Sequence, residues 1–224
     1  MTSRQRIYVL GGVLGVALIA VVLAIAFAGG SKKAGPASPV LSHESSAFLA
    51  GVPQHGDTLG RPDAPATVYV FEDPQCPYCR DWSIGTLPSV VGTFVKTGRV
   101  KLVWHGIPIV GQDSMPGLTA AYGAGKQNRL WNFVDQLYKR QGAENSGWIN
   151  DATLRDAAKA SGVNADRMLA DAKTVDPRIR QSESEANTYG VNGTPSFVVN
   201  GKLLPLTSLQ PGDFNTALAA ALGQ

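Results

Sequence analysis

Cysteine and histidine are scarce in this sequence: its 224 residues include two cysteines, Cys76 and Cys79, and three histidines. A structural zinc site usually takes four Cys or His ligands, with a second pair at metal-binding spacing. The chain has no such second pair, because His43, His55 and His105 are scattered along it. The composition therefore argues strongly against zinc, and we expect no metal.

Excess charge is also absent from most of the chain. The formal net charge of +3 comes from five side chains near the N-terminus: Arg4, Arg6, Lys32, Lys33 and Glu44. Residues 49–224 retain 16 of the 20 basic and 16 of the 17 acidic side chains, so their net charge is zero. They also lack a run of Lys or Arg with interleaved aromatic residues, the pattern typical of a nucleic-acid surface. Nucleic acid is therefore not an expected partner.

Charge is missing altogether from residues 7–28, an apolar run of 22 residues. A helix of ~20 residues crosses the ~30 Å hydrocarbon core of a bilayer, whereas the apolar part of a cleaved signal peptide is usually ~7 to 15 residues long. We therefore predict an N-terminal transmembrane signal anchor over residues 1–28. Cleavage after Ala28 is the alternative, since Ala26-Phe27-Ala28 is a small-x-small pattern. No cysteine follows the run, which excludes a lipoprotein.

The residues around this segment bear on its orientation. Two arginines and the α-amine before it nearly balance two lysines after it, so the positive-inside comparison is close to a tie. The very short tail and the signal-like layout favour a cytoplasmic N-terminus. Residues 29–48 are rich in Gly, Pro, Ser and Ala and are predicted to be a flexible linker. The prediction is a single-pass protein of the cell membrane whose domain, residues 49–224, is extracytoplasmic.

The first half of the domain is predicted to form a strand, a helix and a second strand. Residues 66–71 are a β-branched and aromatic run typical of a buried strand. Apolar residues then recur at helical spacing, so a helix should begin beside Cys76, with Pro77 in its first position, where no backbone N–H is needed. Pro88 should kink this helix. Residues 100–110 are predicted to be the second strand.

The second half begins with a long helical block over residues 112–190. Asn150, Asn164 and Asp176 are candidate N-caps within it. The sequence then predicts a strand at 197–199, a tight Asn-Gly turn, a returning strand at 203–206 and an amphipathic helix over 214–222. This order indicates an α/β fold with an inserted helical subdomain.

Cys76 and Cys79 lie at the start of the predicted first helix, directly after a buried strand. An inert local disulfide explains them poorly, because so small a loop removes little entropy from the unfolded chain. The peptide N–H groups and the dipole at a helix N-terminus favour a thiolate at Cys76. Cys76 could then attack a disulfide, and Cys79, one turn further in, could displace the mixed disulfide. The pair is therefore predicted to be redox-active.

A second motif, Gly193-Thr194-Pro195, precedes the predicted strand at 197–199. By itself this proline is equally consistent with an ordinary trans turn. The whole arrangement, with a strand, CPYC and a helix followed by a distant Thr-Pro, a hairpin and a last helix, resembles the thioredoxin fold. Pro195 comes 119 positions after Cys76, and a bare strand-helix-strand connection needs only ~30 residues or more. Together with Phe71-Glu-Asp-Pro-Gln-Cys-Pro-Tyr-Cys79, this helical insertion resembles the membrane-anchored DsbA-like thiol:disulfide oxidoreductases.

The resemblance implies a role for each matching residue. In this family the proline is cis and lies beside the cysteines, where an extended substrate can pair with the backbone before it. The implied roles are nucleophile for Cys76, resolving thiol for Cys79, tuning of the redox pair for Pro77 and Tyr78, and a substrate platform for Thr194 and a cis Pro195.

Two positions near the cysteines leave alternatives open. Asp73 could act as a proton acceptor near Cys79, or it could simply form the turn beside Pro74. The strongest oxidants of the family place His where Tyr78 stands, so a cationic donor to the thiolate is absent here. Because CPYC also occurs in glutaredoxins, the expected redox potential is nearer ~−200 mV than ~−120 mV.

We predict from these residues that the chain introduces disulfide bonds into exported proteins through its own Cys76–Cys79 disulfide, without a metal or an organic cofactor. The resemblance implies reoxidation by a quinone-linked membrane protein of the DsbB or VKOR type. The alternatives are an extracytoplasmic disulfide reductase or isomerase, and a non-catalytic peptide-binding or chaperone module on the same fold.

Overall fold

The computed structural model describes residues 43–223. The predicted signal anchor at 1–28, its cleavage site and most of the predicted linker lie outside these residues. Within residues 43–223, no helix combines the length and apolar character needed to cross a bilayer.

The centre of the molecule is a six-stranded sheet in the order β1-β2-β4-β3-β5-β6. Its strands are β1 (Gln54–His55), β2 (Thr58–Leu59), β3 (Ala66–Glu72), β4 (Val100–Gly106), β5 (Ser196–Val199) and β6 (Lys202–Leu203). The central pair β3 and β4 is parallel, and every other neighbouring pair is antiparallel. This confirms the predicted first strand, while the β1–β2 hairpin had no signal in the sequence.

Two predicted strands are longer than the observed ones. The second, predicted over 100–110, ends at Gly106: the Ile107 N–H still donates to the Glu72 carbonyl at 2.9 Å, but Pro108, which follows, has no N–H to continue the ladder. The returning strand predicted at 203–206 is reduced to Lys202–Leu203. The turn between β5 and β6 is as predicted, since Asn200 and Gly201 both adopt left-handed backbone angles, with φ of 52° and 75°.

The connection between β3 and β4 is helical throughout but irregular. It consists of α2 (Pro77–Asp81), the π-helical turn η2 (Trp82–Thr86), α3 (Leu87–Val90) and a second π-helical turn, η3 (Val91–Val95). A kink is predicted at Pro88; the structure instead has the wide η2 turn directly before the α3 segment that contains this proline. A proline lacks the N–H of an i→i−4 bond and crowds the carbonyl four residues back, and a π-turn relieves both effects.

The helical insertion predicted over 112–190 is confirmed. It comprises η4 (Gln112–Ser114), α4 (Met115–Gly125), α5 (Leu130–Tyr138), α6 (Asp151–Ser161), α7 (Ala165–Ala172) and α8 (Asp176–Tyr189). Asn150 and Asn164 are N-caps as predicted, and their side chains accept from the backbone N–H groups of Thr153 and Arg167. The prediction for Asp176 is wrong, because this residue is the first of α8 and Val175 precedes the helix.

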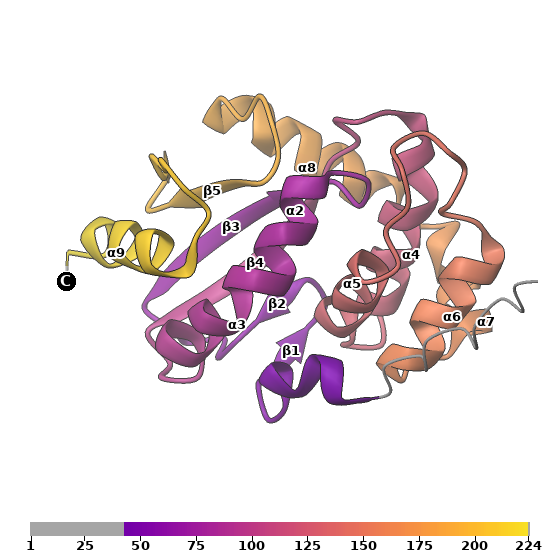
Figure 1. Cartoon of the computed structure of the whole chain (residues 1–224), viewed down its shortest axis with the longest axis horizontal. Coiled ribbons are helices and arrows are strands. Elements are labelled where there is room, and N and C mark those ends of the chain that lie inside the picture. Colours follow the sequence, from indigo (N-terminus) through magenta and orange to yellow (C-terminus); the bar gives the residue numbers. More distant parts are fainter. Residues whose placement is uncertain (1–42, 224) are drawn as a thin grey trace, which may run out of the picture. The chain divides into compact units, whose positions relative to one another are not determined.

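The sheet is covered on both faces (Figure 1). Alternate residues of β3 point to opposite faces: Val68 and Val70 belong to the main core with Trp82, whereas Phe71 packs with Ala186 of α8. On the first face α9 (Pro211–Ala221) contacts η2 and α3, and Trp82 lies with its ring centroid 4.8 Å from that of Phe197. Each such buried aromatic side chain contributes about 2 kcal/mol to folding.

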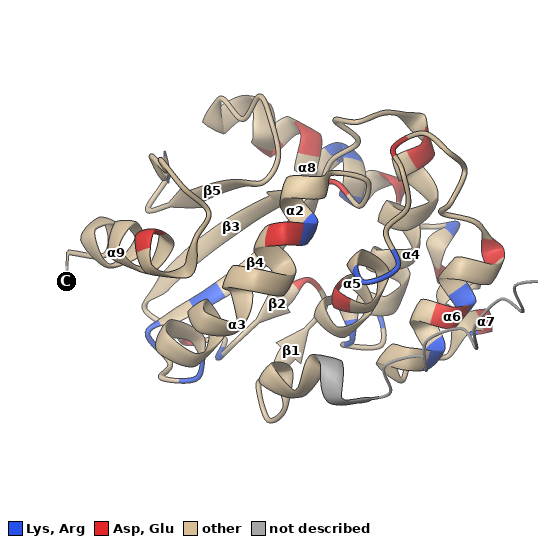
Figure 2. Ribbon diagram, viewed as in Figure 1, with Lys and Arg blue, Asp and Glu red and all other residues tan. Residues whose placement is uncertain are grey.

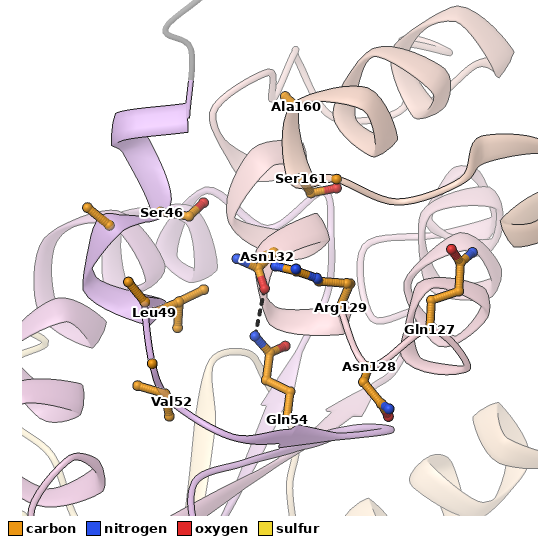
Figure 3. A pocket seen from close by; sticks show the side chains of 14 residues that line it. Ser46, Leu49, Val52, Gln54, Gln127, Asn128, Arg129, Asn132, Ala160 and Ser161 are labelled. Carbon is orange, nitrogen blue, oxygen red and sulfur yellow. Dashed lines mark hydrogen bonds between the residues drawn. The ribbon is translucent and has the colours of Figure 1, made fainter.

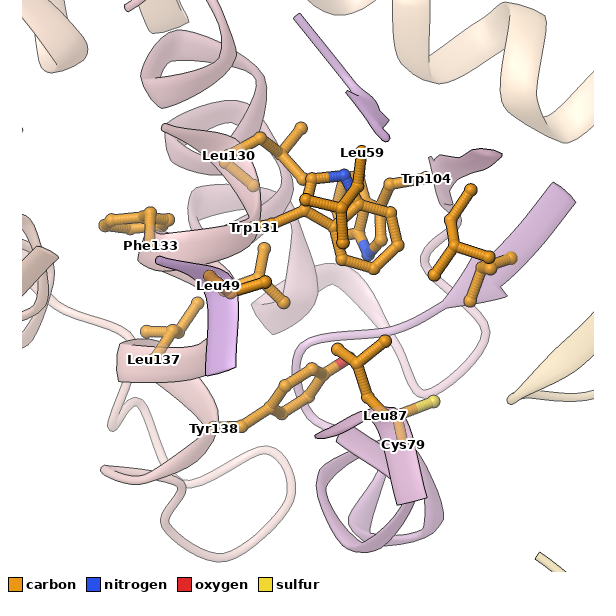
Figure 4. Close-up of a cluster of buried hydrophobic side chains, with 14 of the residues drawn as sticks. Leu49, Leu59, Cys79, Leu87, Trp104, Leu130, Trp131, Phe133, Leu137 and Tyr138 are labelled. Atoms are coloured by element: carbon orange, nitrogen blue, oxygen red, sulfur yellow. The ribbon is translucent and has the colours of Figure 1, made fainter. Parts of the chain in front are cut away.

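The main core extends from the sheet into the insertion (Figure 4). Leu59 and Trp104 of the sheet and Leu130 and Trp131 of α5 are all fully buried. Cys79 belongs to the same cluster, near Tyr138. The second cysteine of the motif is therefore part of the hydrophobic core.

The structure differs from the prediction at the C-terminal end of the linker. Residues His43–Leu49 form a short helix, η1, and Leu49 is 3% exposed within the main core. Ser46 Oγ donates to Asp135 Oδ2 at 2.6 Å. The domain therefore begins several residues before residue 49.

A polar pocket of about 580 Å³ lies between η1, the start of α5 and the end of α6 (Figure 3). Its lining includes Gln54 and Asn132, joined by a 2.6 Å hydrogen bond. Neither cysteine lines this pocket. The redox pair lies elsewhere, at the start of α2.

Candidate active site

The site forms where β3 ends and α2 begins. The Cys76 N–H donates to the Asp73 carbonyl at 3.0 Å, which closes a tight turn. Cys76 is the N-cap of α2 in an extended conformation, and Pro77 occupies the first turn as predicted. Both cysteines are free thiols, so the structure represents the reduced pair.

Cys76 lies in an environment that stabilises its thiolate. Its pKa is lowered to about 6, first by a hydrogen bond from the Cys79 thiol, then by one from the Thr194 side chain and by the backbone N–H groups of Cys79 and Tyr78. Partial burial opposes this shift. The first turn of α2 therefore supplies donors to the sulfur, as expected for a helix N-terminus. At neutral pH the reduced Cys76 is mainly a thiolate.

Cys79 has the opposite environment. It is completely buried, and this burial is the main reason why its pKa is raised well above the ordinary value. Its hydrogen bond to Cys76 and the negative charge of Glu72 raise the pKa further. Cys79 therefore holds its proton under conditions in which Cys76 has lost one.

The Asp73 carboxylate is engaged in the turn. Its Oδ1 accepts from the Gln75 N–H at 2.8 Å and from Ser114 Oγ at 2.6 Å, and its Oδ2 accepts from the Val110 N–H at 2.8 Å. Burial raises its pKa, and these three donors oppose that rise. The Asp73 side chain therefore stabilises the turn before the cysteines, which is the turn-forming role given above as the alternative to a proton acceptor.

Glu72 is the residue that the sequence reasoning missed. It is 1% exposed, and burial raises its pKa to about 8 despite the hydrogen bond from Trp104 Nε1 to Oε2 at 2.7 Å. Its Oε1 has no hydrogen-bond partner among the described residues. An acidic residue at the end of an otherwise apolar strand was the available signal, because β3 is buried on both faces at that point.

The Thr194–Pro195 peptide bond is cis, as the resemblance implied. The Cys76 thiol lies against it, with Sγ 3.2 Å from the Thr194 carbonyl oxygen. The two motifs, 118 residues apart, are thus in direct contact.

A groove of about 780 Å³ begins at this contact. It runs from Tyr78 and Asp81 of α2 past Thr194 and Pro195 to residues 203–210. Tyr78 and Leu203 are large side chains that remain exposed, at 66% and 41%. The site can therefore hold an extended apolar segment beside the Cys76 sulfur.

Comparison with known proteins agrees with this geometry. The family model described as Thioredoxin matches residues 54–218. The chain is 31% identical over 152 residues to a probable disulfide bond formation protein D of Bacillus cereus, covering 65% of this chain and 70% of that one. This chain is a DsbA-like member of the thioredoxin family.

Two further comparisons extend the similarity beyond the motif. A probable disulfide bond formation protein D of Bacillus anthracis is 27% identical over 209 residues, covering 91% of this chain and 92% of the relative. The crystal structure of oxidised BdbD from Bacillus subtilis superposes with a TM-score of 0.67 at 21% identity, covering 77% of this chain and 98% of that structure. The DsbA-like fold therefore extends through the helical insertion, and the chain is a thiol:disulfide oxidoreductase.

The surroundings of this DsbA-like pair lack a directed cation. Tyr78 occupies the position between the cysteines where the resemblance places His in the strongest oxidants, and it is mostly exposed. Arg80, one residue after Cys79, pairs with Asp81 at 2.7 Å. Figure 2 shows basic and acidic residues side by side on α2. The thiolate at Cys76 is therefore stabilised by hydrogen-bond donors, without help from the Arg80 charge.

Proposed function

We propose that this chain is a disulfide donor, which passes its Cys76–Cys79 disulfide to reduced cysteine pairs in exported proteins. The observation that supports this direction is the pKa of Cys76, which is lowered to about 6. Stabilising the thiolate stabilises the reduced pair, and a pair whose reduced form is stable is an oxidant. The relatives named disulfide bond formation protein D support the same direction.

The reaction would proceed through a mixed disulfide. A substrate thiolate attacks Cys76 Sγ, the Cys76–Cys79 bond breaks, and Cys79 leaves and takes up a proton. The second substrate thiolate then attacks the substrate sulfur of the mixed disulfide and releases Cys76 as a thiolate. Two electrons move to the enzyme and the substrate gains one disulfide. The low pKa of Cys76 favours its departure, because a thiol of low pKa is the better leaving group.

In this proposal Glu72 carries the proton of the buried cysteine. With a pKa of about 8 it is largely protonated at neutral pH and can donate to Cys79 when the disulfide opens. During reoxidation the same carboxylate accepts the proton that Cys79 must lose. A buried carboxyl group with a pKa near the working pH suits both directions. Asp73 is less suited, because its carboxylate oxygens are already occupied by three donors.

The groove beside Pro195 would bind the substrate segment that carries the reacting cysteine. Thr194 lies just before the start of β5, and a segment placed beside its backbone could extend the sheet by main-chain pairing. Tyr78 and Leu203 would contact its apolar side chains. A site of this type selects extended chains with apolar residues near the cysteine, a feature of proteins that have not finished folding.

The cellular setting belongs to the same proposal. An oxidase must regain its disulfide, and the family resemblance suggests a quinone-linked membrane protein of the DsbB or VKOR type as its oxidant. The apolar run at residues 7–28 would hold the enzyme at the same membrane, with the catalytic domain outside the cytoplasm. Disulfides form and persist in such compartments.

The deciding experiment is the redox equilibrium of the full-length chain with glutathione, read by alkylation of the free thiols. We expect a potential between ~−150 and ~−200 mV, because the pKa of Cys76 lies between those of the strong oxidant DsbA and thioredoxin. A potential near ~−270 mV would overturn the donor role and indicate a reductase that is supplied with electrons.

A further inference from the structure

Residues of the helical insertion hold the turn before Cys76. These residues belong neither to the Cys-Pro-Tyr-Cys motif nor to the Gly-Thr-Pro motif. We propose that Gln141 is a positioning residue: its side-chain amide holds the Cys76 backbone so that the sulfur meets the donors of α2. This inference rests on the proposed redox role of Cys76. It concerns the thiolate itself, whichever way electrons flow.

Gln141 lies just after α5 and reaches the turn directly. Its Nε2 donates to the Pro74 carbonyl at 2.9 Å and to the Cys76 carbonyl at 3.1 Å. One amide group therefore bridges the carbonyls on either side of Gln75. The Gln141 backbone is itself anchored, because its N–H donates to the Tyr138 carbonyl at 3.1 Å.

The end of α5 makes a second bond to the same turn. Tyr138 donates its hydroxyl to the Asp73 carbonyl at 3.2 Å from a fully buried position. The end of α5 therefore donates to three carbonyl oxygens of this turn, those of Asp73, Pro74 and Cys76. The Cys76 carbonyl also accepts the first hydrogen bond of α2, from the Arg80 N–H at 3.2 Å.

Gln75 ties the turn to the loop that follows α5. Its side chain is 1% exposed; Oε1 accepts from the Asn145 N–H at 2.7 Å, and Nε2 donates to Ser114 Oγ at 3.0 Å and to Asn145 Oδ1 at 3.3 Å. The loop fits closely here, since a Cβ on Gly111 would lie 2.9 Å from Asn145 Oδ1. The turn is thus fixed from two loops of the insertion.

The consequence for chemistry follows from the geometry of a helix start. The Cys76 sulfur is stabilised by the N–H groups of Tyr78 and Cys79, which point along α2. Cys76 comes before the first residue of this helix. The position of its sulfur relative to these N–H groups therefore depends on the hydrogen bonds that fix the Cys76 backbone. Of the bonds that hold it, those from Gln141 come from a half-buried side chain that can be changed without opening the core.

The test compares Gln141→Leu with the wild type in the full-length chain. The substitution keeps the side-chain size and removes both donated bonds. We expect the Cys76 pKa, followed by the ultraviolet absorbance of the thiolate, to rise by about one unit. The glutathione equilibrium should shift about tenfold toward the disulfide, which corresponds to a potential ~30 mV more negative.

Two further variants keep the outcome clear. Gln181→Leu removes an exposed glutamine of α8 that bonds only to Glu185, and it should change neither quantity. Gln141→Met has about the length of the native side chain, lacks its N–H donors and adds no charge, so it should raise the pKa as much as Gln141→Leu. It decides the question by the same criterion if Gln141→Leu does not fold.

A lower melting temperature with an unchanged Cys76 pKa and an unchanged equilibrium would overturn the positioning role and leave Gln141 a stabilising residue only. The test of Gln141 and the test of the proposed function can fail independently of each other. The wild-type potential tests the direction of electron flow, whereas the difference between wild type and variant tests Gln141.

Discussion

Cys76 and Cys79 are identical side chains three residues apart, yet they lie in two chemically opposite regions. The Cys76 side holds backbone N–H donors, a carbonyl from the Thr194–Pro195 segment and the start of an apolar groove. The Cys79 side is closed core, with Glu72, Trp104 and Tyr138 around it. The pKa is lowered to about 6 in the first region and raised in the second. One helical turn therefore separates a cysteine that is a reactive thiolate from one that keeps its proton.

The largest effect should come from removing the sulfur on the accessible side. Cys76→Ser should lower the rate of oxidation of a reduced two-cysteine peptide by at least ~1,000-fold, because the variant cannot form the Cys76–Cys79 disulfide and the remaining thiol, Cys79, is fully buried. Given the same peptide in its disulfide form, Cys79→Ser should instead accumulate enzyme–peptide adducts, because Cys76 attacks the peptide disulfide and no Cys79 thiol is left to displace the mixed disulfide; the adducts are visible by non-reducing electrophoresis. Adducts that formed with Cys76→Ser and not with Cys79→Ser would reverse the two roles.

The next largest effect should come from the closed side. Glu72→Gln keeps the shape and the bond from Trp104 to one oxygen but cannot exchange a proton. We expect roughly 100-fold slower disulfide transfer at pH 7 in stopped-flow measurements. The rate of the wild type should follow a group that titrates near pH 8, and the variant should lose that dependence.

Glu72→Gln should slow disulfide transfer but make the folded protein more stable at alkaline pH. The folded-state pKa of Glu72 is raised to about 8 from an ordinary 4.5, so the folded protein holds a proton that the unfolded chain releases. The stabilisation this proton provides is complete below pH ~4.5 and is lost as the pH rises to ~8. Glu72→Gln should therefore raise the free energy of unfolding at pH 8, measured in urea, by up to ~5 kcal/mol, which corresponds to a pKa rise from 4.5 to about 8. An equal pH slope in both proteins would contradict the assignment.

Asp73 offers a comparison with its neighbour Glu72. Asp73→Asn cannot accept from all three donors, so the free energy of unfolding should fall by about 2 kcal/mol. Its rate of disulfide transfer, measured under conditions in which the variant is folded, should fall by less than ~3-fold. The substitution weakens the turn but leaves the proposed proton carrier, Glu72, in place. A rate loss near 100-fold, with Glu72→Gln unimpaired, would exchange the roles of the two carboxyl groups.

The smallest effect should come from the rim of the groove. Leu203→Asp should raise the KM for an apolar peptide by about 5-fold with kcat unchanged, since it removes apolar contact from binding only. Ile84→Asp is the matched control, because Ile84 is also 41% exposed and lies outside the groove. Equal effects of the two substitutions would show that the groove does not bind the peptide.

Patterns local to the chain were readable from the sequence. The cysteine spacing, the strand before it, Pro77 at the helix start and the caps at Asn150 and Asn164 each depend on residues within a few positions of one another. The position of Pro195 beside Cys76 was also anticipated, although only through the resemblance to a known family.

The features that the sequence did not reveal depend on distant partners. Glu72 is a buried acid because Trp104, 32 residues later, donates to it, and neither residue signals this alone. Gln141 reaches the Cys76 carbonyl, and Gln75 reaches Asn145, only through the fold. The polar composition of this segment likewise gave no sign of η1, whose Leu49 is buried in the core and whose Phe48 packs against it.

The two outermost strands of the sheet, β1 and β6, are only two residues long, and Pro205 follows β6 closely. Long unpaired edges recruit other extended chains and seed aggregation. A protein whose proposed clients are unfolded polypeptides meets such chains constantly. Its short edge strands leave little backbone on which a client could pair in the wrong place, so they favour the pairing proposed at Thr194, beside the Cys76 sulfur.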